Sequence, residues 1–332
     1  MSSLQAASLL PGDPPLMEYR RLAAGEALPP TTLCAISFGP QPRAMTPERS
    51  LAVCLGLPAL VGTGLTELWH AAGPVGLGHE GPLHYASSPH LLAGRIEIEE
   101  QAAGGLEAAA AEAYAAIARF TARSDHRHLL RMYNNLSDIN VGDGDAERYK
   151  LFCSGRARGL RERRAGPLPA ATAVGRQDHR PLLQVYWIAA DEPGKAIENP
   201  RQVSAFNYPR QYGPSPPSFS RAMLTTAGLL VSGTGSILGH ASRHPGDLQA
   251  QLDEILRNLA SVRQASGGPA VLVSGRGTLL KVYLRDASAA GFVSGYLREQ
   301  LPSQVQLVVL GADICRRELL VEIDAAHFGP AA

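Results

Sequence analysis

The chain has 332 residues, of which 45% are hydrophobic and 18% charged, and its formal net charge is +1. This length accommodates two domains with separate cores, and a charge near zero gives no general attraction to nucleic acid or to a membrane surface. No apolar run reaches the ~20 residues that cross a bilayer, and the N-terminus lacks the basic start and cleavage site of a signal peptide. We therefore expect a cytoplasmic protein with no nucleic-acid partner and no membrane association.

The first half of the chain predicts mixed strands and helices. Residues 11–58 are rich in proline and glycine and hold one strand-like run at 33–38, and further strand-like pieces occupy 79–98. A helix is predicted over 105–123, where apolar side chains recur at helical spacing on one face. The remaining predicted elements are a strand at 128–136, a turn at 141–145, a helix at 146–163, and strands at 170–174 and 182–189.

The same order of elements returns after a polar, proline-rich passage at 191–217. The predicted elements are a hairpin of 224–227 and 229–233, a helix capped by Asp247 and extending to about Val262, a strand at 278–285, a helix at 287–300, and strands at 304–310 and 318–323. Residue identities barely match between the halves, so either a duplication or a coincidence explains the repeat, and we favour duplication. The predicted fold class is α+β, with two tandem units that each place two helices on one face of a mixed, mostly antiparallel sheet.

The last predicted strand carries a carboxyl group on a partly apolar face. Side chains alternate along a strand, so Val321 and Ile323 would cover a core while Glu322 lies on the opposite face. The first interpretation is a solvated acid on the wet face of an antiparallel sheet, which is the commoner case. The second is a buried acid with a raised pKa that can give a proton to a substrate.

Two loop-like segments are candidates for binding a small anion. Residues 207–221 combine Arg210 and Arg221 with Tyr208 and Tyr212, and an arginine fork with tyrosine hydroxyls suits a carboxylate. The alternative is that these arginines simply face solvent. The glycine-rich stretch 232–240 lacks the order of a phosphate loop, so it is either a tight hairpin end or a pocket wall kept small for a ligand.

Two further features have an ordinary interpretation beside a functional one. The arginine-rich run 155–164 lies at a helix end and predicts a solvated face rather than a nucleic-acid patch, with only Arg156 turning inward. The four cysteines, Cys34, Cys54, Cys153 and Cys315, form no CxxC pair or other metal spacing, which predicts free thiols and no structural zinc. Cys315 precedes Glu322 by seven residues and is either core packing or part of a site.

Several segments together resemble one family. The second half, with the segments 230–233, 281–286 and 321–323, resembles the YjgF/RidA fold, which is also described as chorismate-mutase-like. The segments 131–135, 139–140, 147–149, 152–156, 207–213 and 232–240 add a resemblance to the chorismatases, which are built from two YjgF-like domains. The resemblance covers the chain from about residue 125 and implies a degenerate first domain at 1–195 and a second domain at 196–332, with the active site at their junction.

The resemblance implies a reaction and a set of site residues. Chorismatases split the enolpyruvyl ether of chorismate and release pyruvate, without a cofactor or metal. Glu322 would protonate the enolpyruvyl methylene, with Cys315 and Gly235 completing the catalytic set. The residues expected to bind the substrate are Tyr133, Asn134, Tyr149, Arg156, Tyr208, Arg210, Tyr212 and Arg221.

The resemblance also favours one branch of the family. Members that hydrolyse chorismate to a dihydrodiol carry alanine in the Ser-Gly-Thr-x-Ser segment, whereas hydroxybenzoate-forming members resemble this chain in pairing Gly235 with Cys315. We therefore expect a 3-hydroxybenzoate synthase. Some members of this branch also release 4-hydroxybenzoate, and such products serve aromatic pigment and ubiquinone biosynthesis. The alternatives are a chorismate hydrolase and a non-catalytic anion-binding protein. An imine deaminase is disfavoured, because Leu307 stands where many small YjgF/RidA proteins place a carboxylate-binding arginine. The expected assembly is a monomer or a homotrimer.

Overall fold

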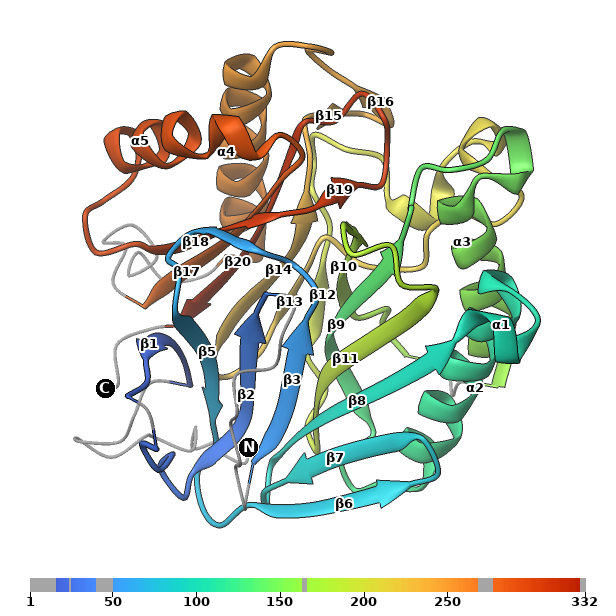
Figure 1. Cartoon of the computed structure of the whole chain (residues 1–332), viewed down its shortest axis with the longest axis vertical. Helices are drawn as coiled ribbons and strands as arrows, with labels where there is room; N and C mark the ends of the chain where they lie inside the picture. The colour runs from blue at the N-terminus through green and yellow to red at the C-terminus, as the bar shows by residue number, and fades with distance from the viewer. Residues whose placement is uncertain (1–15, 24, 40–49, 163–165, 268–276, 329–332) are drawn as a thin grey trace.

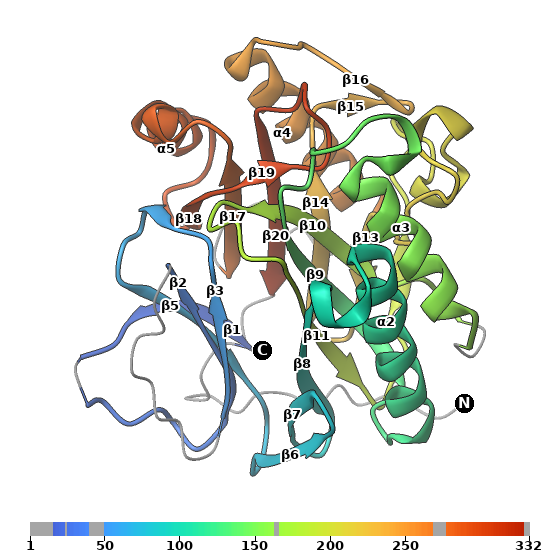
Figure 2. The ribbon, with the colours of Figure 1, turned by 45° about the vertical axis from the view of Figure 1, so that its right-hand side comes forward.

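A computed structural model describes residues 16–23, 25–39, 50–162, 166–267 and 277–328. The described chain forms three larger sheets that surround a common interior, with helices outside two of them (Figures 1 and 2). The first sheet has the order β1 (Met17–Arg21), β5 (Leu65–His70), β2 (Thr32–Phe38) and β3 (Leu51–Leu55). Its strand β2 confirms the run predicted at 33–38.

The second sheet is the sheet of the first predicted unit. Its order is β19 (Asp313–Ile314), β10 (Ala170–Arg176), β9 (His128–Ser137), β11 (Leu182–Ala190), β8 (Leu91–Glu99), β7 (Leu83–Ser87) and β6 (Gly76–Glu80). The short helix α1 (Glu100–Ala103) leads into α2 (Leu106–Arg123), and α3 (Arg148–Gly159) packs beside α2 on one side of this sheet (Figure 2). The helices approach closely because Gly155 and Gly159 face α2, where any Cβ would overlap its atoms.

The third sheet is the sheet of the second unit. Its order is β12 (Lys195–Ile197), β13 (Ala222–Leu224), β14 (Gly228–Thr234), β20 (Val321–Phe328), β17 (Thr278–Leu284), β18 (Gln306–Gly311) and β4 (Ala59–Val61). Helices α4 (Leu248–Ser266) and α5 (Ala290–Gln300) cover its outer face. Asp247 caps α4 as predicted, because its side chain accepts a hydrogen bond from the backbone N–H of Ala250. A small hairpin, β15 (Ile237–Leu238) and β16 (Ala241–Ser242), stands apart from the sheets.

The two units share one topology, which confirms the predicted α+β tandem fold. In the first unit the strand order is β10-β9-β11-β8-β7, and in the second it is β18-β17-β20-β14-β13. Each strand has its counterpart at the same place in the chain order, and in both units the pair before the last strand, β9/β10 or β17/β18, is parallel. Such agreement supports a duplication that the residue identities alone did not reveal.

Strands also pass between the units. The predicted boundary between residues 195 and 196 falls inside β12, which belongs to the third sheet, while β4 and β19 each lie in the sheet of the other half. The predicted helix at 146–163 begins at Arg148 and ends as α3 at Gly159, followed by a 3-10 turn at Leu160–Glu162; Arg163 lies outside the described residues. This exchange of strands joins the two halves.

The last strand differs from the interpretation that one of its faces is exposed to solvent. β20 begins at Val321, after Glu318 and Leu320, and continues to Phe328 with every residue buried. Val321 and Ile323 pack toward the helices, while the opposite face, with Glu322 and Asp324, looks into the interior that the three sheets share. Glu322 is only 5% exposed, so the interpretation as a solvated acid is wrong.

Candidate active site

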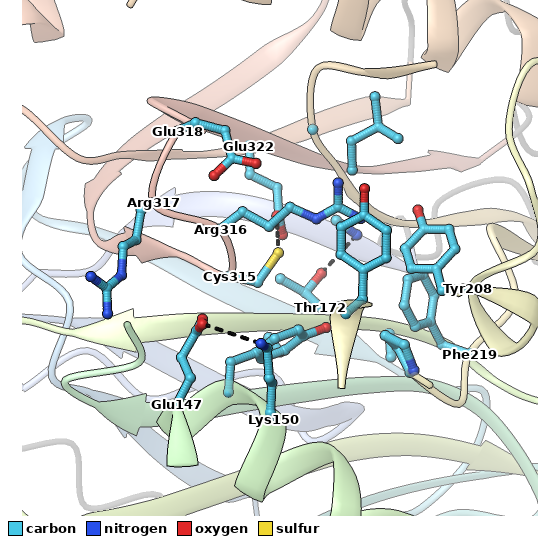
Figure 3. A pocket seen from close by; sticks show the side chains of 18 of the residues that line it. Glu147, Lys150, Thr172, Tyr208, Phe219, Cys315, Arg316, Arg317, Glu318 and Glu322 are labelled. Atoms are coloured by element: carbon cyan, nitrogen blue, oxygen red, sulfur yellow. Dashed lines mark hydrogen bonds and ion pairs between the residues drawn. The ribbon is translucent and has the colours of Figure 1, made fainter. Parts of the chain in front are cut away.

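A cavity of about 230 Å³ lies where the two units meet, and Figure 3 views it from close by. Its walls come from the start of α3, from β10, from the loop before β13, from the end of β14, and from the turn that joins β19 to β20. The lining residues that carry polar or reactive side chains are Glu147, Tyr149, Lys150, Arg156, Thr172, Tyr208, Gln211, Tyr212, Arg221, Cys315, Arg316, Arg317, Glu318 and Glu322. The cavity is thus lined by five of the residues predicted to bind a substrate and by all three of the predicted catalytic set, Glu322, Cys315 and Gly235.

The Glu322 carboxyl keeps its proton at neutral pH. Burial, helped by the nearby negative charge of Asp324, raises its pKa to about 8, although Arg131, Arg221 and Arg316 oppose the shift. The thiol of Cys315 lies 3.9 Å from its Oε2 atom, and burial raises the pKa of that thiol as well. Figure 3 shows these two side chains side by side at one wall of the cavity. A neutral carboxylic acid that borders a cavity can serve as a proton donor.

Strand β14, which lies beside Glu322, requires glycine at position 233. A Cβ at Gly233 would overlap the Oε1 atom of Glu322, so the carboxyl lies directly against the β14 backbone. Gly235 is less constrained, because its Cβ would come no closer than 3.0 Å to a side-chain methyl of Leu319. Of the two interpretations of this glycine-rich stretch, the structure supports the pocket wall, since Gly233 and Gly235 both line the cavity.

Two buried arginines present unsatisfied donors at the cavity. Arg156 is 3% exposed, and its Nε and Nη2 atoms have no hydrogen-bond partner. Arg221 is 5% exposed; its Nη2 atom donates to the carbonyl oxygen of Val203 and to the hydroxyl of Tyr208, while its Nε atom has no partner. Buried guanidinium N–H groups without an acceptor are costly, and an anionic ligand in the cavity would satisfy them.

Arg316 is a cavity residue that the sequence reasoning missed. Its guanidinium lies 4.0 Å from the ring centre of Tyr212 and 5.2 Å from that of Tyr208, and it donates to the carbonyl oxygen of His240 and to Ser242. This stacking orients a third positive charge toward the same space (Figure 3). The sequence did hold a signal for this residue, because Arg316 directly follows Cys315, which was already a candidate site residue.

Three residues expected to bind the substrate do not line the cavity. Tyr133 stacks on Tyr186 in the interior between the sheets, and Asn134, on the other face of β9, accepts from the hydroxyl of Tyr114 and donates to the carbonyl of Thr172. Core contacts hold both side chains, by ring stacking for Tyr133 and by two hydrogen bonds for Asn134. Arg210 is exposed and makes two hydrogen bonds to Asp145, at 2.9 and 2.6 Å. Tyr149, Arg156, Tyr208, Tyr212 and Arg221 do line it.

The described residues give two further negative findings. In these parts of the chain no cluster of three or more histidine, cysteine, aspartate or glutamate side chains is arranged to hold a metal ion. No helix of the described segments is long and apolar enough to cross a membrane. All four cysteines are free thiols, and Arg156 alone of the described arginines at the end of α3 turns inward, whereas Arg158 is half exposed and pairs with Glu107.

A protonated carboxylic acid that faces buried arginines across a small cavity is an arrangement typical of enzymes that act on small anions. Comparison with known proteins identifies the family. Residues 67–189 match the family model described as Chorismatase FkbO/Hyg5-like, N-terminal. A chorismatase of Streptomyces rapamycinicus is 36% identical over 273 residues, which are 78% of this chain and 80% of that protein.

Two other relatives agree. A protein named 3-hydroxybenzoate synthase, from Streptomyces hygroscopicus, is 36% identical over 59% of this chain and 62% of its own length. The crystal structure of a chorismatase superposes with a TM-score of 0.84 at 28% identity, covering 94% of this chain and 97% of that one. This chain belongs to the chorismatase family, as the resemblance in its sequence implied.

Proposed function

We propose that this protein converts chorismate to 3-hydroxybenzoate and pyruvate. The observation that carries the proposal is the protonated Glu322 at the wall of a cavity that is also lined by four arginines. Chorismate carries two carboxylates, which can accept hydrogen bonds from the unpaired arginine N–H groups. It also carries an enolpyruvyl ether, whose double bond an acid can protonate.

The first step is proton transfer from Glu322 to the methylene carbon of the enolpyruvyl group. This generates an oxocarbenium-like centre and leaves Glu322 as a carboxylate. The C3–O bond of the ring then breaks, and its electron pair stays with the oxygen that becomes the carbonyl of pyruvate. The acid therefore supplies the charge that turns the enolpyruvyl group into a leaving group.

The second step distinguishes a synthase from a hydrolase. In the proposed synthase, the ring's own 4-hydroxyl attacks C3 and loses its proton, giving an arene-oxide-like intermediate that opens and rearomatises. Chorismate and the sum of its two products contain the same atoms, so no water is consumed. A hydrolase would instead add one water and give a dihydroxycyclohexadiene carboxylate.

Gly235 and Cys315 support the synthase branch. Gly235 leaves space beside Leu319, and the neutral thiol of Cys315 stands next to the acid in the cavity. The pair has the composition that the hydroxybenzoate-forming members show in the family resemblance. Release of some 4-hydroxybenzoate, and a supply to pigment or ubiquinone biosynthesis, stay predictions.

The decisive experiment is incubation of the purified protein with chorismate, with the products separated by chromatography and Glu322→Ala as the control. We expect 3-hydroxybenzoate and pyruvate in equal amounts, and neither from the variant. A dihydroxycyclohexadiene carboxylate would keep Glu322 as the acid and refute the use of Gly235 and Cys315. Binding of chorismate with no product in either protein would favour the non-catalytic anion-binding protein.

Arg156 and Arg210 form a matched pair for testing which arginines hold the substrate. Arg156→Met removes donors that await an acceptor in the cavity, and a hydrogen bond to a charged group contributes about 1.5–3 kcal/mol, so we expect KM for chorismate to rise about 10- to 100-fold. Arg210→Met breaks an exposed ion pair with Asp145, and we expect KM to change less than about twofold. Steady-state kinetics of both variants at pH 7 measures this difference. Equal effects, or an unchanged KM in Arg156→Met, would remove Arg156 from the site.

A further inference from the structure

A second carboxyl lies beside the acid and has the opposite surroundings. Asp324 shares the face of β20 with Glu322, two residues away, and is 4% exposed. Its Oδ2 atom accepts from the hydroxyl of Tyr283 at 2.8 Å and from the hydroxyl of Thr172 at 3.1 Å, and it pairs with Nη2 of Arg131 at 3.0 Å. The only side-chain donor recorded for Glu322 among the described residues is the thiol of Cys315, at 3.9 Å.

The two carboxyls differ in how many donors surround them. Three donors, one of them the guanidinium of Arg131, face the carboxyl of Asp324, whereas burial raises the pKa of Glu322. Asp324 lies on the same buried face of β20, and its negative charge opposes ionisation of Glu322. In this pair of carboxyls, Asp324 is held by its ion pair with Arg131, and Glu322 is the group that can donate a proton.

We propose that Asp324 is a positioning residue for the acid, because its fixed negative charge keeps the catalytic proton on Glu322. This inference rests on the proposed role of Glu322 as the proton donor and explains how that role is maintained at neutral pH. Asp324 is not among the residues that line the cavity, so it acts through Glu322 and not on the substrate.

Thr172 connects the fixed charge to the cavity wall. Its hydroxyl donates to Asp324 and accepts from Nη2 of Arg131 at 2.5 Å and from the backbone N–H of Gly233 at 3.0 Å. Gly233 is the residue against which the Glu322 carboxyl lies. One hydroxyl therefore holds both the charge of Asp324 and the backbone that positions the acid.

The other charged or titratable groups around Glu322 do not explain its retained proton. Arg131 from β9, Arg221 before β13, and Arg316 after β19 all lower the pKa of Glu322, and the Cys315 and Tyr149 groups are neutral because burial raises their pKa values. After burial itself, Asp324 is the largest contribution that raises the pKa of this acid. Removing the charge of Asp324 should therefore release the proton of Glu322 at lower pH.

The test is the pH dependence of kcat/KM for Asp324→Asn, a substitution that preserves shape. In the unaltered protein we expect activity to fall as pH rises through about 8, where Glu322 ionises. In Asp324→Asn we expect this fall at least about one pH unit lower, with activity at pH 5.5 kept within about threefold. A fall at the same pH in both proteins would overturn the proposal and leave Asp324 with a purely structural role.

Glu67 offers a matched control. It forms an ion pair with Lys281 at 2.6 Å, both side chains are fully buried, and Glu67 does not contribute to the shift at Glu322. Glu67→Gln breaks a buried pair just as Asp324→Asn does, so both variants should lose thermal stability. Only Asp324→Asn should move the pH profile. A shift of the same size in Glu67→Gln would show that general damage to the core, and not the charge of Asp324, moves it.

A second variant covers the case in which the uncompensated Arg131 prevents Asp324→Asn from folding. Arg131→Met/Asp324→Asn removes both charges of the pair, which a protein interior tolerates better than a single buried charge. The profile should still fall at lower pH than in the unaltered protein, because Asp324 raises the pKa of Glu322 more than Arg131 lowers it. A profile at the original pH or above would contradict the proposal.

Infrared spectroscopy separates failure of this inference from failure of the proposed function. The protonated carboxyl band of Glu322, identified by its loss in Glu322→Gln, can be titrated without chorismate. A band that disappears at lower pH in Asp324→Asn supports the inference even if chorismate is not the substrate. An unshifted band refutes it even if chorismate is turned over.

Discussion

Glu322→Gln is expected to reduce turnover of chorismate by about 10³-fold or more while leaving its binding almost intact. The amide has the shape of the protonated acid but cannot donate a proton to carbon, and general acid catalysis contributes about 10²- to 10⁴-fold to rates. In the proposed mechanism this protonation creates the leaving group, so its loss stops the reaction at the first step. Binding by titration calorimetry, together with single-turnover kinetics, measures both quantities.

The same substitution should make the protein more stable at neutral pH. The pKa of Glu322 lies at about 8 in the folded chain and near 4.5 when exposed, so between these values the folded chain holds a proton that the unfolded chain has released. The free energy of unfolding therefore falls as pH rises through this window. Glutamine carries no such penalty, and at pH 7 the gain should be on the order of 3 kcal/mol, vanishing below pH 4.

Thermal or denaturant unfolding at several pH values checks this prediction. A variant that is inactive, binds chorismate and gains stability relative to the unaltered protein as pH rises would show that the folded protein keeps a protonated Glu322 at a cost in stability. Loss of stability at every pH would mean that Glu322 is ionised and paired in the folded protein. That outcome would contradict its role as a proton donor.

Gly233→Ala should be almost as damaging, for a steric reason. The new Cβ would overlap the Oε1 atom of Glu322, so the carboxyl or strand β14 must shift. A displacement of about 1 Å at a catalytic group can cost about 10²-fold in rate. We expect kcat to fall by roughly this factor, with a smaller change in KM because Arg156 and Arg221 are not displaced.

Gly235→Ala is the matched control two residues along the same segment. Its Cβ would meet only a methyl of Leu319 at 3.0 Å, at the flexible end of that side chain. We expect the fold and the proton transfer to survive, so pyruvate is still released. Under the proposed function, the products should shift from 3-hydroxybenzoate toward the dihydroxycyclohexadiene carboxylate. Rates of pyruvate release and product chromatography measure the two effects, and equal loss of pyruvate release in both variants would contradict the steric argument.

Local patterns were sufficient for most of the elements. Helices α2 and α4 follow from apolar residues at helical spacing and, for α4, from the cap at Asp247, since these signals act within a few residues. The repeated order of elements also followed from the sequence, although only the shared strand order of the two sheets demonstrates it. The strand exchange by β4 and β19 was missed, because pairing between distant segments leaves no local signal.

The sequence predicted cavity residues where they belong to a short motif. It did not predict positions that depend on contacts between distant segments. Tyr133 and Asn134 were expected to meet the substrate, yet their hydrogen-bonding and stacking partners lie across the sheet and outside any short motif. Arg210 was predicted because it lies among tyrosines in the sequence, and Arg316 was not considered. In the folded chain it is Arg316 that stacks on Tyr208 and Tyr212, while Arg210 meets Asp145, 65 residues away.

By itself, the sequence determined the α+β class, the tandem order of elements, and the placement of Glu322 opposite Val321 and Ile323 on one strand, because alternation and periodicity depend on neighbouring residues only. The tertiary structure decided whether that acid is charged. Its face of β20 packs into the interior shared by three sheets, where burial and the fixed charge of Asp324 hold the proton on Glu322. Protonation depends on everything that surrounds a group in space, and those surroundings come from strands far apart in the chain, such as β9 and β20.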